Sequence, residues 1–177
     1  MGLEDFGVRL TPANQGVTER AIKQTLQNLD FHLCSPQTVY GGARLGELIQ
    51  DELLFISRTG QGIFEAQVKL ERDIQKNTVR YLSLRMAICQ PDVALNYFVR
   101  LLSTIVLEQE LTISVDDQEF NRHQIKDFSI YAKKQVILQK RRWQQIFEGD
   151  TEEKVLSPSE AWNYFLEKHR ALATSPR

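Results

Sequence analysis

The sequence has few of the residues that build metal sites, disulfide frameworks and common catalytic centres. It contains 2 cysteines and 3 histidines in 177 residues, and no histidine lies at ligand spacing from a cysteine or from another histidine. The metal-binding patterns HExxH and CxxC are absent, and so are the phosphate-binding patterns GxxxxGK[ST] and GxGxxG and the GxSxG nucleophile turn. We therefore expect no metal ion and no cofactor.

Long apolar runs and an excess of charge of one sign are also missing. No segment approaches the roughly 20 apolar residues that span a bilayer, since the longest candidate, 93–107, is interrupted by Arg100 and by three polar residues. The N-terminus carries Glu4 and Asp5 and lacks the basic head and apolar run of a signal peptide. With 22 basic and 23 acidic side chains, the chain has no cationic surplus with which to neutralise phosphates. We expect a soluble, cytoplasmic protein without a membrane partner, and the charge balance of the whole chain disfavours a nucleic acid as its partner.

The bulk composition is that of an ordinary globular chain. Hydrophobic residues make up 42% of the sequence and charged residues 25%, and no stretch resembles a linker between domains. We therefore expect one domain over residues 1–177. Cys34 and Cys89 each lie in an apolar run, which favours two buried thiols over a disulfide.

Hydrophobic periodicity predicts an α+β fold. After a short strand or arm at 7–10, apolar residues recur at helical spacing over about 18–29. Alternation of apolar and polar residues then predicts an antiparallel meander over about 31–89. An apolar helix at about 91–107 and a strand at about 110–115 follow, and helices at about 121–148 and 158–170 complete the chain, although 128–138 also fits a strand. The expected architecture is an antiparallel meander sheet with helices packed on one face and a helical C-terminal third.

One charge run stands out in the expected C-terminal helix. Lys133-Lys134 and Lys140-Arg141-Arg142 are opposed within it only by Asp127. Such a run is typical of a solvated helix face whose last turns favour basic residues. It also fits a docking surface for an acidic partner protein. Nucleic-acid binding is the weaker alternative, because no aromatic residues are interleaved with the cations.

Two functional hypotheses from different classes follow. The first is a non-enzymatic protein-binding module that occludes or adapts a partner protein, for example a bacterial toxin-neutralising immunity protein. The second is a small enzyme with its site around His32 and Cys34, which share one face of an expected strand. No catalytic residue is assigned. The candidate partner-binding residues are all charged: Arg44, Glu47, Asp116, Asp117, Lys133, Lys134, Lys140, Arg141 and Arg142.

Overall fold

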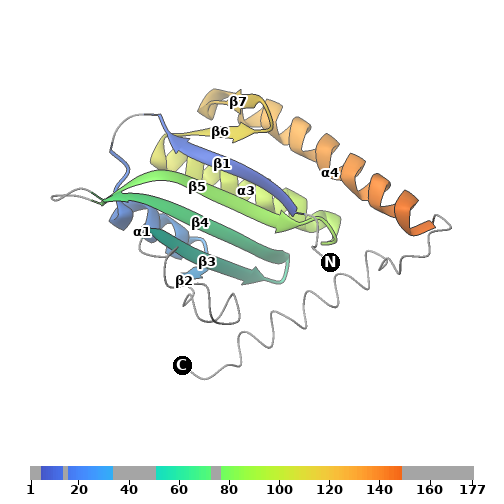
Figure 1. Ribbon diagram of the computed structural model, residues 1–177, viewed down its shortest axis with the longest axis horizontal. Helices are drawn as coiled ribbons and strands as arrows, with labels where there is room; N and C mark the ends of the chain where they lie inside the picture. The colour runs from blue at the N-terminus through green and yellow to red at the C-terminus, as the bar shows by residue number, and fades with distance from the viewer. Residues whose placement is uncertain (1–4, 14–15, 34–50, 73–76, 149–177) are drawn as a thin grey trace, which may run out of the picture.

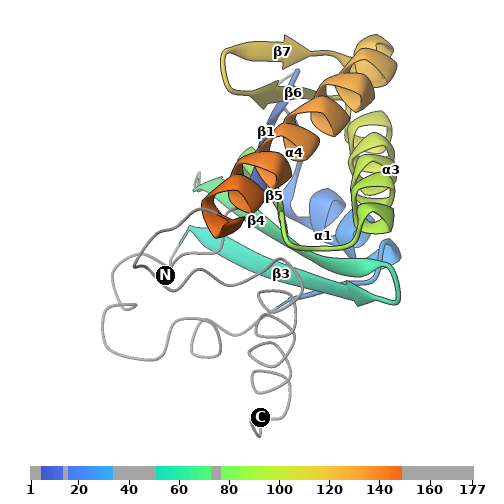
Figure 2. The same ribbon diagram turned by 90° about the vertical axis from the view of Figure 1, so that its right-hand side faces the viewer.

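The chain forms a seven-stranded antiparallel sheet with its helices on one side, as the computed structural model shows (Figures 1 and 2). The structure describes residues 5–13, 16–33, 51–72 and 77–148. The strand order is β2-β3-β4-β5-β1-β6-β7. The elements, in chain order, are β1 (Asp5–Pro12), α1 (Glu19–Asn28), β2 (Phe31–Leu33), β3 (Glu52–Thr59), β4 (Gly62–Arg72), β5 (Asn77–Ala87), α3 (Asp92–Gln109), β6 (Leu111–Val115), β7 (Gln118–Phe120), η1 (Arg122–Gln124) and α4 (Ile125–Glu148).

The meander from β2 to β5 follows directly from the alternating sequence. In β4 the side chains of Phe64, Ala66 and Val68 are buried, and the residues between them are partly exposed. Each strand of this run pairs with the next in antiparallel register. The register shifts between Lys69 and Leu70, which leaves one extra residue in β5 at Arg80. This bulge turns Val79 to the buried face, on the same side as the even-numbered core residues of β5.

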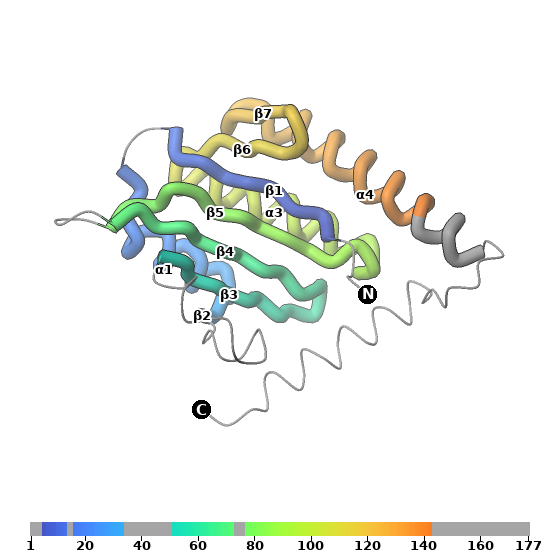
Figure 3. Tube along the Cα trace, viewed as in Figure 1, coloured from blue at the N-terminus to red at the C-terminus, as the bar shows by residue number. Residues whose placement is uncertain are grey.

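The N-terminal strand lies in the middle of the sheet, where the sequence pattern indicated only a short strand or arm. β1 pairs with β5 from Asp5 to Leu10 and with β6 from Arg9 to Pro12, both antiparallel (Figure 3). β5 and β6 therefore run in the same direction on either side of β1, and α3 connects them across one face of the sheet. Phe6, Val8 and Leu10 point into the core beneath this helix.

The helices bury one face each against the sheet or against one another. The side chain of Thr18 caps α1 by accepting a hydrogen bond from the Ala21 amide at 3.2 Å. α3 contributes seven buried residues, Ala94, Leu95, Phe98, Leu101, Leu102, Ile105 and Val106. The ring of Phe98 meets the ring of Phe6 edge to face, with 5.8 Å between centroids.

Residues 128–138 are helical, so the alternative of a strand for this segment is wrong. Phe128, Ala132 and Val136 recur at a spacing of four and are buried, which gives α4 one apolar stripe. The sequence pattern missed β7, which precedes the segment expected to be helical, and η1, which occupies the start of that segment. Asn121 and Gln124 form a capping box there. The helix expected at 158–170 lies outside the described residues.

A buried glutamine in the turn between β5 and α3 binds both β4 and α4 at one end of the sheet. The Gln90 side chain accepts a hydrogen bond from the Ile63 amide at 2.8 Å and donates one to the Ile63 carbonyl at 2.6 Å. The Gln90 backbone carbonyl accepts a further bond from Lys140 of α4 at 2.8 Å. Gly62 makes room for this arrangement, because a Cβ there would lie 2.6 Å from the Gln90 Oε1 and 3.0 Å from the Ala94 Cβ.

Replacing Gly62 is therefore expected to destabilise the fold. Gly62→Ala should lower the free energy of unfolding by about 1–3 kcal/mol, as overpacking of a filled interior does. Gly60 lies in the same turn, and a Cβ there would meet nothing within 4 Å. Gly60→Ala should therefore change the free energy by less than about 0.5 kcal/mol. Urea denaturation of both variants tests this, and equal stabilities would contradict the role given to Gly62.

Candidate functional site

The outward side of α4 carries most of the basic residues singled out in the sequence. Its exposed residues lie opposite the buried stripe of the helix. We call them the outer face of α4: Lys126, Asp127, Ile130, Lys133, Lys134, Ile137, Leu138, Arg141 and Arg142. Five of these nine are cations and one is an acid. The face is therefore strongly basic on a chain whose formal net charge is −1.

Aliphatic side chains lie among these cations. Ile130 is 69% exposed, Ile137 46% and Leu138 37%. Six large hydrophobic side chains are exposed in the described part of the chain, and three of them are on this one face. The others, Leu33, Val93 and Leu107, are scattered over β2 and α3. A solvated helix face gains nothing from such a cluster, so the clustering favours the docking interpretation.

Lys140 does not belong to the outer face, although the sequence grouped it with Arg141 and Arg142. Its side chain is 22% exposed and pairs with the Asp92 carboxylate at the start of α3. Its Nζ also donates to the Gln90 carbonyl. As a candidate for partner binding Lys140 is thus engaged within the fold, where it fastens α4 to α3.

The acidic candidates lie at the other end of α4. Asp116 and Asp117 form the turn between β6 and β7, and Asp116 has a positive φ of 50°. The Tyr131 hydroxyl of α4 donates a hydrogen bond to Asp116. Burial, this hydrogen bond and the charges of both aspartates raise the pKa of Tyr131 to about 12, so the phenol stays protonated. Arg44 and Glu47 lie outside the described residues.

Only one residue of the enzymatic alternative lies in the part of the chain that the structure describes. His32 is exposed on β2, and Cys34 lies outside the described residues. Cys89 is buried, and burial raises the pKa of its thiol to about 11, which leaves it un-ionised at neutral pH. No group of three or more His, Cys, Asp or Glu residues in the described segments is placed to hold a metal ion.

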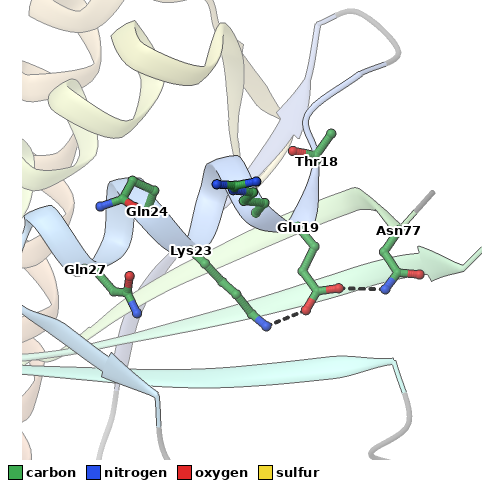
Figure 4. A pocket seen from close by; sticks show the side chains of 7 residues that line it. Thr18, Glu19, Lys23, Gln24, Gln27 and Asn77 are labelled. Carbon is green, nitrogen blue, oxygen red and sulfur yellow. Dashed lines mark hydrogen bonds and ion pairs between the residues drawn. The ribbon is translucent and has the colours of Figure 1, made fainter.

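Two shallow polar depressions open on other surfaces. The first, of about 550 Å³, runs along α1, where Lys23 and Asn77 both point to the Glu19 carboxylate (Figure 4). These two hydrogen bonds lower the pKa of Glu19. The second, of about 440 Å³, lies on the open side of β5, β1 and β6 and is lined by Gly7, Val8, Arg9, Ser83, Arg85, Ser114, Val115 and Asp116. Among the described residues, neither depression is lined by a histidine or a cysteine.

Comparison with known proteins adds no assignment. No protein-family model matches the chain, and no curated protein matches it significantly. None of the helices in the described part of the structure has the length and apolarity to cross a membrane.

The structural role of Lys140 predicts a contrast with its exposed neighbours. Lys140→Ala should lower the free energy of unfolding by about 1–2 kcal/mol, because the buried Gln90 carbonyl loses a charge-assisted hydrogen bond. Lys134→Ala, on the outer face, should change it by less than about 0.5 kcal/mol. Thermal and urea denaturation measure both. If the Lys140→Ala variant were as stable as the Lys134→Ala variant, Lys140 would have no structural role and would again be a candidate for partner binding.

The raised pKa of Cys89 predicts slow alkylation. In a Cys34→Ser background Cys89 is the only remaining thiol, since the chain has 2 cysteines. At pH 8 about one Cys89 thiol in a thousand is ionised in the folded protein, against roughly a quarter in the unfolded chain. Iodoacetamide should therefore label the native protein at least about 100-fold more slowly than the protein in urea. Rapid native labelling would contradict the burial and the raised pKa of the Cys89 thiol.

Proposed function

We propose that this protein is a non-enzymatic binding module that holds another protein against the outer face of α4. The observation that carries the proposal is the cluster of exposed aliphatic residues, Ile130, Ile137 and Leu138, within a strongly basic helix face. Protein interfaces combine an apolar centre that excludes water with charged groups around it. The outer face has both parts on one rigid element.

The mixture of residues favours a protein over a nucleic acid. Phosphate backbones are bound by cations, by polar side chains and by backbone amides. Ile130 and Ile137 would contribute nothing to contacts with phosphates, and both side chains would stay exposed to water in a complex with nucleic acid. An acidic protein surface with apolar side chains would satisfy both the cations and the aliphatic residues of the face.

Binding on α4 is suited to occluding or adapting a partner. An immunity protein that covers the active site of a toxin would be one instance of this mode, and this finer assignment stays a prediction. Its support is the charge of the face, which would complement an acidic cleft. The same chemistry would serve an adaptor that joins two proteins.

Affinity capture with matched variants tests the proposal. The tagged full-length protein should retain one stoichiometric partner from its source extract at low salt. Carbodiimide coupling should join Lys126, Lys133 or Lys134 to carboxylates of that partner. Lys134→Glu combined with Arg141→Glu should abolish retention, because reversing charges at an interface creates repulsion. Arg20→Glu, on the exposed side of α1, should leave retention unchanged.

Three results would overturn the proposal. The first is a partner retained equally by the Lys134→Glu/Arg141→Glu variant and the unmodified protein. The second is carbodiimide coupling of the α4 lysines to acidic residues of the same chain, such as Glu152 or Glu153. The third is no retained protein at any salt concentration together with retention of nucleic acid by the unmodified protein.

A further inference from the structure

We propose that the partner segment docked on α4 is an acidic amphipathic helix whose aliphatic and carboxylate side chains alternate at helical spacing. This inference rests on the proposed function and specifies the occupant of the same face. It follows from the order of residues along the centre of the outer face, where Ile130, Lys134, Ile137 and Arg141 succeed one another. All four are exposed.

These four residues form one line along α4. Their spacings are four, three and four residues, the spacing that keeps side chains on a single helix face. At 1.5 Å per residue the line is about 16 Å long, or three turns. Aliphatic and cationic side chains alternate along it. We call this line the central seam.

A helix is the element that matches the central seam best. Two helices packed side by side bring residues together at the same three- and four-residue intervals along both. A partner helix with Leu or Ile opposite Ile130 and Ile137 would bury these two isoleucines. Glu or Asp on the same helix would lie opposite Lys134 and Arg141. Lys134 and Arg141 would lay their aliphatic stems along the interface and keep their charged groups at its rim.

The charges of the face argue against a second copy of the chain as the occupant. In a two-fold symmetric contact the same surface faces itself. Such a contact would bring together Lys126, Lys133, Lys134, Arg141 and their copies, with Asp127 as the single acid of each face. Like charges at close range oppose association, so the face is poorly matched to its own copy and better matched to an acidic surface.

A designed peptide tests the inference without knowledge of the natural partner. The probe is a helical peptide of about 18 residues with Leu and Glu alternating at spacings of four and three and with Ala elsewhere. A peptide of the same composition in scrambled order is its control. When the ordered peptide is titrated into the ¹⁵N-labelled full-length protein, the amide signals of the outer face of α4 should shift. The scrambled peptide should bind with an affinity at least about tenfold lower.

Variants separate docking from simple charge attraction. Ile137→Ser, which keeps every charge, should weaken the ordered peptide about tenfold through the loss of apolar burial. Lys134→Gln should also weaken it. Leu107→Ser, which removes an isolated exposed leucine from α3, should have no effect. Equal binding of ordered and scrambled peptides, or insensitivity to Ile137→Ser, would overturn the helical occupant.

Other occupants give distinct results. A dimer in sedimentation equilibrium that dissociates in Ile130→Glu would identify a second copy, and tighter binding to phosphatidylserine vesicles than to the peptide would identify a membrane surface. Either result overturns the inference. A natural partner coupled to α4 through a non-helical acidic segment, with no binding of the peptide, would overturn the inference and leave the proposed function intact.

Discussion

The bonds made by Gln90 fix the start of α3 and the helix α4 relative to β4. This residue is fully buried, and its amide group spans both backbone groups of Ile63, which fixes the beginning of β4 to the start of α3. The Gln90 carbonyl receives Lys140, which fixes α4 at the same place. A buried polar group is costly unless it is hydrogen-bonded, so the arrangement in which both polar atoms of the Gln90 side chain have partners is favoured over neighbouring packings of the same apolar residues. The directional bonds of Gln90 thus give a fixed position to helices that hydrophobic contact alone would leave free to slide.

Much of the fold could be predicted from local patterns, and the remainder depends on contacts that no local pattern contains. The alternation in β4 and β5 requires a half-buried sheet, and the short turns between strands require antiparallel neighbours. The apolar face of α3 likewise identifies a core helix. The place of β1 is different, because its partners Leu84 and Ile113 are distant along the chain. β1 has the same alternating pattern whether it lies at an edge or in the centre of a sheet. Three-residue β7 is too short for any period to show.

The sequence could predict which kinds of residue form the candidate site, but not which individual residues belong to it. The cations of α4 are visible in the sequence, but Lys140 and Arg141 are neighbours with the same charge and opposite roles. A rotation of about 100° per residue along a helix turns one of them toward Asp92 and the other toward solvent. The aliphatic residues were missed for a related reason. Ile130 and Ile137 resemble core residues until Phe128, Ala132 and Val136 are known to form the buried stripe. Helical periodicity counted from Phe128 was the signal that could have found them.

The attachment of α4 at two points bears on how well its outer face can bind. Tyr131 is hydrogen-bonded to Asp116 in the first half of the helix. Lys140, nine residues further along, is bonded to Asp92 and to the Gln90 carbonyl. Between these points the buried stripe packs against the core. Most of the central seam therefore lies on a helix whose backbone is fixed before a partner arrives. Association is weakened by the ordering of loops and side chains, and a surface already ordered loses less freedom on binding. The hydrogen bonds of Lys140 and Tyr131 therefore favour binding at the outer face of α4, because they order the helix, although neither residue lies on that face.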